Sequence, residues 1–181
     1  MTENVTIVTV CYNSLGVLPA MLKSVPDGTP VVLVDNASKD TAALQELADE
    51  HNATLLLNAD NTGFGPACNQ GAAGAETEFL LFLNPDAELQ PGALEGFLKA
   101  AREYENASGF NPRILDSSGR QSFRRGSKLR PAERLRGSVP TADAEVSVLA
   151  GSAIFCRRAL LRKSAALTPR SLCITRMMTC R

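Results

Sequence analysis

Residues 5–14 read VTIVTVCYNS, a β-branched apolar run from Val5 to Cys11 that is followed by Tyr12, Asn13 and Ser14. A continuous apolar run of this length indicates a strand that is buried on both faces of a sheet. Asn and Ser are typical residues for the start of a helix, and apolar residues then recur at helical spacing from Leu15 to Leu22. The opening therefore predicts a buried strand that leads into a helix.

The same alternation repeats along the next ninety residues. Apolar strands are predicted at residues 31–34, 54–57 and 79–83, and helices at about 41–50, 64–75 and 91–104. A further short strand is predicted at 146–149. Strands that alternate with helices predict an α/β fold with a mostly parallel sheet and helices on both faces. Ligands of such sheets bind beyond the carboxyl ends of the strands.

Composition excludes several classes of protein. The chain has 181 residues with 19 Lys plus Arg and 19 Asp plus Glu, so net charge does not favour nucleic acid as a partner. A membrane-spanning helix needs about 20 consecutive apolar residues, and the sequence contains no such run. The N-terminus also lacks the features of a signal peptide, so a cytoplasmic location is expected. Five cysteines without a C-x-x-C pair predict neither a disulfide framework nor a zinc site.

Three polar segments follow the ends of predicted strands. Asp35, in the segment DNASKDT, can accept hydrogen bonds from a ribose or a base, although Ser38 or Asp40 equally suits a helix cap. The second segment, residues 61–71, carries Gly63 and Gly65 ahead of a helix N-terminus that suits a phosphate. A tight strand-to-helix turn explains this segment as well.

The third segment is Asn84-Pro85-Asp86, directly after an apolar strand. A hard divalent cation prefers oxygen ligands, so one carboxylate together with diphosphate oxygens could hold Mg²⁺ or Mn²⁺. Taken alone, the same residues also suit a proline turn.

In this order and spacing, the three segments and residues 8–14 resemble family 2 glycosyltransferases, especially the rhamnosyltransferase-like branch. The resemblance covers residues 5–161. It implies a Rossmann-like GT-A fold, incomplete here at the C-terminus, and inverting, metal-dependent sugar transfer. The donor would be a nucleoside-diphosphate sugar, with dTDP or UDP as its nucleotide. The acceptor would be a glycan or lipid-linked acceptor in cell-surface polysaccharide synthesis.

The resemblance also carries roles for single residues. Asp86 matches the metal-binding carboxylate, and Gly151 matches a glycine near the acceptor site. The residues expected to bind the nucleotide sugar are Thr9, Tyr12, Asn13, Asp35, Asn61, Gly63, Asn69 and Asn84.

The chain departs from the family after Leu161. The family continues with an acidic Glu-Asp pair that supplies the general base, whereas residues 162–181 contain no Asp or Glu, so the catalytic base is unknown here. A shifted codon can be built from the last base of one codon and the first two bases of the next. Read in this frame, residues 164–166 could encode Gly-Gly and residues 175–177 could encode Glu-Asp. Because Met has a single codon, residues 177–179 must encode Asp-Asp in this frame. We therefore expect a catalytic domain at 1–161 and a frameshifted tail at 162–181.

Residues 111–144 are rich in Arg, Gly and Pro and are expected to be loop-rich. Their arginines suit an anionic lipid-linked acceptor or the inner face of a membrane, whereas the interruptions by Asp116 and Glu133 favour a solvated loop. Two other functions stay open: a nucleotidyltransferase, and a truncated remnant that binds nucleotide without activity. A dehydrogenase would need G-x-G-x-x-G after the first strand, and this motif is absent.

Overall fold

The computed structural model describes residues 4–116, 118–122, 149, 151–163 and 177–180. The helices are α1 (Leu18–Ser24), α2 (Thr41–Glu50), α3 (Phe64–Ala73), α4 (Ala93–Glu103) and α5 (Arg158–Lys163). The main strands are β1 (Val5–Cys11), β2 (Val31–Asp35), β3 (Thr54–Leu57), β4 (Phe79–Leu83), β5 (Gly109–Pro112), β8 (Ala153–Arg157) and β9 (Met177–Cys180). A small hairpin is formed by β6 (Ile114–Leu115) and β7 (Gln121–Ser122).

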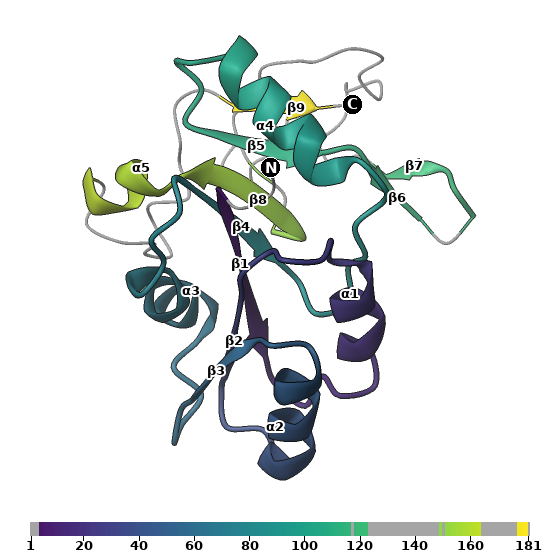
Figure 1. Cartoon of the computed structure of the whole chain (residues 1–181), viewed down its shortest axis with the longest axis vertical. Helices are drawn as coiled ribbons and strands as arrows, with labels where there is room; N and C mark the ends of the chain where they lie inside the picture. The colour runs from purple at the N-terminus through teal and green to yellow at the C-terminus, as the bar shows by residue number, and fades with distance from the viewer. Residues whose placement is uncertain (1–3, 117, 123–148, 150, 164–176, 181) are drawn as a thin grey trace, which may run out of the picture.

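The main strands form one sheet in the order β3-β2-β1-β4-β8-β5-β9 (Figure 1). β1 runs parallel to both β2 and β4, and β2 runs parallel to β3. β8 is antiparallel to its two neighbours, β4 and β5. The α/β fold with a mostly parallel sheet is therefore confirmed, and the antiparallel β8 separates its two parts.

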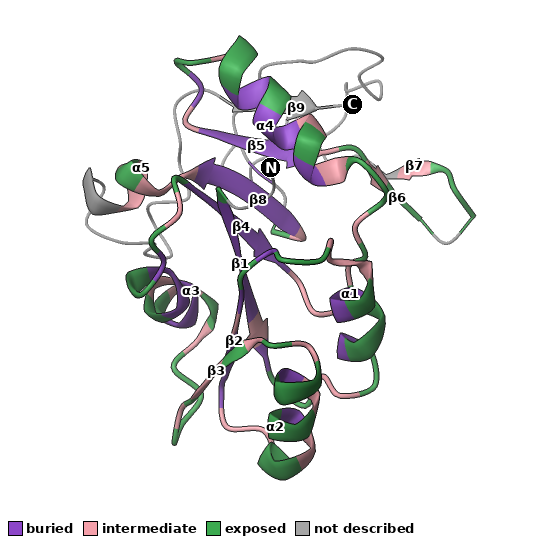
Figure 2. Ribbon diagram, in the orientation of Figure 1, coloured by how far each residue is buried: buried purple, intermediate pink, exposed green. Residues whose placement is uncertain are grey.

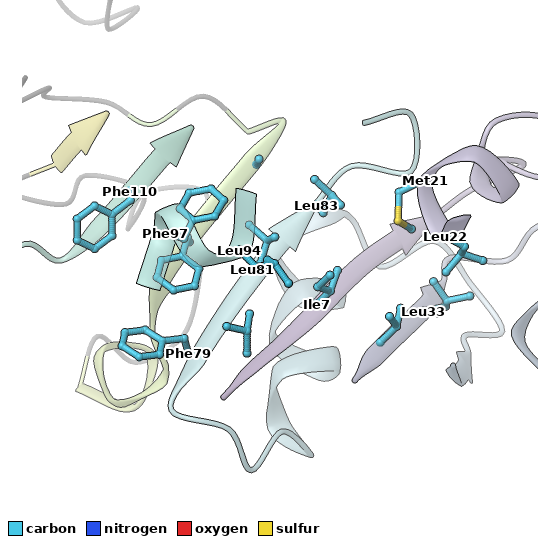
Figure 3. Packing of buried hydrophobic residues seen from close by; sticks show 14 of the residues in the cluster. Ile7, Met21, Leu22, Leu33, Phe79, Leu81, Leu83, Leu94, Phe97 and Phe110 are labelled. Carbon is cyan, nitrogen blue, oxygen red and sulfur yellow. The ribbon is translucent and has the colours of Figure 1, made fainter. Parts of the chain in front are cut away.

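Helices cover both faces of the sheet, as the sequence analysis predicted (Figures 1 and 2). One apolar cluster joins β1, β2 and β4 to α1, α2 and α4, and Figure 3 shows part of it. The second cluster packs α3 against the opposite face, through Ala67 and Cys68 on the helix and Val8 and Val34 on the sheet. Burial on both faces explains why the central strands are apolar without alternation.

Four phenylalanines hold the second half of the sheet to α4. The Phe155 ring on β8 stacks on Phe79 and Phe97 with centroid distances of 5.0 and 4.8 Å. Phe110 on β5 lies 6.1 Å from the same ring in a tilted arrangement. Figure 3 shows Phe79, Phe97 and Phe110 gathered in this region. Aromatic pairs of this geometry add about 0.5–1.5 kcal/mol each beyond their buried area.

Several boundaries differ from the predicted ones. α1 begins at Leu18 rather than near Leu15, because the backbone N–H groups of Val17 and Leu18 both donate to the Ser14 carbonyl oxygen in a turn. The predicted strand 146–149 lies outside the described residues except for Leu149, which is buried but not in a strand.

The segment 111–144 is not wholly a loop. Within its described part, β5 extends to Pro112 and the β6–β7 hairpin follows. The tail also contributes a strand, since β9 pairs in parallel with β5. Backbone hydrogen bonding to an edge strand needs no particular side chain, so local composition did not indicate this pairing. Among the described residues, no helix is long and apolar enough to cross a membrane.

Gly71 sets how closely α3 approaches the sheet. A Cβ atom at this position would overlap Val8 Cγ1 and lie 2.9 Å from Val34 Cγ2. Both valines are β-branched residues on central strands, so their side chains have few other rotamers to adopt. The helix therefore needs glycine here to keep its distance from β1 and β2.

We predict that Gly71→Ala lowers the free energy of unfolding by about 1 kcal/mol or more, because overpacking outweighs the gain in helix propensity. Gly74→Ala is the matched control, since a Cβ there meets nothing within 4 Å, and it should leave stability equal or slightly higher. Urea denaturation of the three proteins measures the difference. Equal stabilities would show that α3 can move away from the sheet without cost.

Candidate functional site

The loops after β1 and β2 are joined by backbone-to-side-chain hydrogen bonds at the carboxyl edge of the sheet. The Asn13 backbone N–H donates to Ser38 Oγ at 2.8 Å, and the Lys39 N–H donates to Asn13 Oδ1 at 3.1 Å. Asn13 itself adopts φ 52°, a left-handed conformation that asparagine tolerates better than most residues. Asn13 therefore links two loops that lie 25 residues apart in the chain.

Asn36 connects the ends of three strands, and the sequence analysis missed it. Its side chain is buried, and Oδ1 accepts hydrogen bonds from Asn58 Nδ2 at 3.0 Å and Thr62 Oγ1 at 3.2 Å. Its Nδ2 donates to the Gly63 carbonyl oxygen at 3.3 Å, and its backbone N–H donates to the Cys11 carbonyl oxygen at 2.8 Å. Its position beside Asp35 in the first polar segment, DNASKDT, was the available signal.

Asp35 ends β2 and is fully buried. Its Oδ2 accepts the Ser38 backbone N–H at 2.9 Å, and its Oδ1 accepts the Ser38 hydroxyl. Each carboxylate oxygen has a second lone pair, so these bonds leave capacity for another donor. Burial and the nearby Asp35 charge raise the pKa of the Cys11 thiol to about 12, which keeps it neutral.

Backbone strain gathers in the same loops. Of the non-glycine residues with positive φ in the described chain, Asn13 and Ala37 lie at this edge and Asn52 lies after α2. Ala37, at φ 67°, has no side-chain oxygen to bond locally, so its left-handed conformation costs about 1 kcal/mol or more. The hydrogen bonds of Asn36 and Ser38, on either side, hold it there.

The turn between β3 and α3 depends on Gly63, which has φ 89° and precedes the first residue of the helix. Its N–H donates to Asn61 Oδ1 at 3.0 Å. Asn61 is exposed, and Asn69 is half-buried within α3. The second predicted segment therefore forms the tight turn that was its simpler interpretation, and the turn is fastened to Asn36.

Tyr12 and Thr9 differ in their access to solvent. The Tyr12 side chain is 56% exposed beyond the end of β1, so its ring is available to a ligand. Thr9 is fully buried, and its hydroxyl has no hydrogen-bond partner in the described part of the chain. Their expected contacts with a nucleoside stay predictions.

Asp86 follows β4 at the same edge and is exposed. The preceding Asn84 is tied to the start of β8, because its N–H donates to the Ser152 carbonyl oxygen at 2.9 Å. The Ala87 N–H in turn donates to the Asn84 carbonyl oxygen at 3.1 Å, which closes a tight turn around Asp86. This turn borders a cavity of about 740 Å³.

The structure thus brings Asn13, Asp35, Asn61 and Gly63 into one connected set of loops. Asp86 and Asn84 lie at the same edge, beyond the neighbouring parallel strand β4. In the described residues, no group of three or more His, Cys, Asp or Glu side chains could hold a metal ion. A cation at Asp86 therefore needs oxygens from a bound ligand or water, and an exposed carboxylate suits that arrangement.

The sequence of this chain is similar to those of two mycobacterial proteins. An N-acetylglucosaminyl-diphospho-decaprenol L-rhamnosyltransferase of Mycobacterium tuberculosis is 29% identical over 134 residues, which cover 66% of this chain and 44% of the relative. An uncharacterized glycosyltransferase of Mycobacterium bovis is 32% identical over 92 residues, which cover 51% of this chain and 41% of the relative. The chain therefore spans less than half the length of these relatives.

Two solved structures share the fold. TarS of S. aureus, in its 1–349 form, matches with a TM-score of 0.69 and 20% identity, covering 97% of this chain and 57% of TarS. A mannosyltransferase of Pyrobaculum calidifontis, solved with GDP-Man and Mn²⁺, matches with a TM-score of 0.62 and 18% identity, covering 91% and 47%. These likenesses place the described sheet and helices in the GT-A fold.

The sequence model of the family described as "Glycosyl transferase family 2" matches residues 6–165, which is most of the chain. This match agrees with the four loops at the carboxyl edge and with both sets of relatives. The chain belongs to glycosyl transferase family 2.

Proposed function

We propose that this chain binds a nucleoside-diphosphate sugar, with UDP or dTDP as its nucleotide, and serves sugar transfer to a glycan or lipid-linked acceptor. The observation that carries this proposal is the set of hydrogen-bonded loops at the carboxyl ends of β1, β2 and β3, next to Asp86. Relatives support it, because one is named a rhamnosyltransferase and TarS has been solved with UDP-GlcNAc. Transfer would invert the anomeric carbon by direct displacement.

The donor site in this proposal follows the joined loops. Tyr12 offers an exposed ring at the end of β1, beside Asn13, and Asp35 lies beneath them with remaining acceptor capacity. Thr9 would contribute from the buried end of β1. The turn at Asn61 and Gly63, the half-buried Asn69 on α3, and Asn84 complete the proposed set.

Asp86 is the proposed ligand for Mg²⁺ or Mn²⁺. The Pyrobaculum mannosyltransferase of the same fold was solved with GDP-Man and Mn²⁺, which supports the use of a divalent cation. When bound, such a cation offsets the negative charge that grows on a leaving diphosphate. The role of Asp86 is to hold the cation beside the diphosphate, with its carboxylate exposed for this contact.

The general base is missing from the proposed site. The family match ends at residue 165, beside the position where the shifted reading frame begins to permit Gly-Gly. We infer that residues 162–181 replace the segment that supplies the base in intact relatives. The chain would then bind donor weakly and transfer sugar slowly or not at all. A lipid-linked acceptor would place the reaction at the cytoplasmic face of a membrane.

Asp86→Ala tests the metal role. With Mn²⁺ and a UDP-, dTDP- or GDP-sugar at about 100 times Kd, the melting temperature of the unmodified chain should rise by roughly 5–10 °C. Asp86→Ala should lose the Mn²⁺-dependent part of this rise, as should the unmodified chain in EDTA. Thermal shift measures all arms.

Asp27→Ala is the control for removal of one charge, because Asp27 is exposed in the loop before β2, at the opposite edge of the sheet. It should keep the full rise. An equal rise in Asp86→Ala would remove Asp86 from the metal role, and the absence of any rise in the unmodified chain would contradict donor binding itself.

Asn36→Ala tests whether the loop network positions the donor. The change leaves Asn58, Thr62 and Gly63 without their shared partner, so stability should fall by about 1–3 kcal/mol. The donor Kd, measured by calorimetry well below the melting temperature, should rise about ten-fold. The exposed Asn106→Ala should change neither quantity. A less stable Asn36→Ala that keeps full donor affinity would restrict Asn36 to folding.

Sequencing of the encoding DNA tests the shifted frame. In the expected DNA, the last base of the Ala166 codon and the first two bases of the Leu167 codon together encode Phe. The last base of the Thr175 codon and the first two bases of the Arg176 codon together encode Glu. Restoring the frame should then give a longer protein with measurable transfer from the donor. Codons that give other residues at these two junctions would remove the idea.

A further inference from the structure

The cavity beside Asp86 is built from four stretches of the chain. Leu83 and the residues after β4 form one side, Ala93 and Phe97 of α4 form the next, and Pro112–Asp116 with Gly119 and Ser152–Ala153 complete it. Its volume of about 740 Å³ falls within the range of about 300–1,000 Å³ that is common for small-molecule sites. Leu83, Leu89 and Phe97 supply part of an apolar wall.

One carboxylate of the lining is already committed to the hairpin. Asp116 Oδ1 accepts the Ser118 N–H at 2.9 Å, the Ser118 hydroxyl at 2.6 Å and the Arg120 N–H at 3.0 Å. The hydrogen bond from the Ser118 side chain, followed by that from the Arg120 backbone, lowers the pKa of Asp116, so this group stays charged and locally satisfied. Asp116 therefore shapes the hairpin that forms one side of the cavity.

Two further charged side chains of the lining are exposed, Glu88 after Asp86 and Arg113 before β6. Within the described residues, neither side chain forms a hydrogen bond or an ion pair. Glu88 presents only acceptors and Arg113 presents only donors. A ligand that binds both must therefore donate and accept hydrogen bonds.

Charge and polarity decide the class of ligand. Asp86 would be occupied by the cation, and Asp116 pairs with Arg120 Nε at 3.8 Å, so Glu88 and Arg113 are the remaining charges of the lining and offset each other. A lining without surplus positive charge gives a phosphate no electrostatic advantage over a neutral ligand. A sugar hydroxyl both donates and accepts, and the apolar face of a sugar ring suits the half-buried Leu89 and Ile114 of the lining.

We propose that this cavity binds a neutral sugar ring of the glycan acceptor, with Arg113 and Glu88 selecting its hydroxyl pattern. The inference rests on the proposed transferase function, because the cavity opens beside the carboxylate that would hold the donor's cation. Under this proposal any diphosphate of a lipid-linked acceptor lies outside the cavity.

Saturation-transfer NMR on the full chain tests the proposal without needing turnover. The probes are methyl glycosides of common hexoses, 6-deoxyhexoses and N-acetylhexosamines, with N-acetylglucosamine 1-phosphate as the anionic counterpart. At least one methyl glycoside should bind, and its Kd should rise about ten-fold in Arg113→Met and in Glu88→Gln, because each change removes a charged hydrogen-bond partner. Lys99→Met and Glu95→Gln, exposed charges on α4, should keep the original Kd.

Three outcomes would overturn the proposal: no methyl glycoside binds, the glycosides bind Arg113→Met and Glu88→Gln as well as the unmodified chain, or the sugar phosphate binds more tightly than its neutral counterparts. Near-unchanged melting temperatures, expected for exposed positions, show that the variants are folded. Failure of the donor proposal is recorded separately, as loss of the Mn²⁺-dependent thermal shift with nucleotide sugars.

Discussion

The parallel pairing of β1 with β2 and β4 is the constraint on which the site depends. Because parallel strands end at the same edge, the residues after Cys11, Asp35 and Leu83 reach solvent together, although they are separated by up to 72 residues. Burial of β1 on both faces fixes the register, since a slip by one residue would exchange the side chains facing α1 with those facing α3.

Above this edge, polar side chains determine how the loops lie. Where the hydrogen bonds between β1 and β2 end, Asn36 bonds to the end of β1 through its backbone and to the loop after β3 through its side chain. These bonds hold the end of β1 and the loop after β3 together. The bond network also holds Ala37 in a left-handed conformation. Loops that are fixed before a ligand arrives lose less conformational entropy on binding, which would favour affinity for the proposed donor.

β8 gives the site its second side. It runs antiparallel beside β4, so its first residues meet the last residues of β4, and Asn84 bonds to Ser152. The same strand carries Phe155, which packs against Phe97 on α4 and Phe110 on β5. Asp86 thus lies between the hydrogen-bonded loops after β1, β2 and β3 on one side and an open, partly apolar cavity on the other.

Local sequence determined the elements whose signals are short-range. The apolar runs at 31–35, 54–57 and 79–83 and the capped helix at 41–50 were predicted within a residue, and the order of the polar segments indicated the family. Burial of Asn36, the approach at Gly71, the pairing of β9 and the cavity at Arg113 were not predictable. Each depends on residues far apart in the chain, such as Asn84 and Ser152 or Gly71 and Val8, that meet only after the helices and strands have packed. Hydrogen bonds and close contacts between distant segments are decided by that packing, because local propensity holds no information about which partner arrives.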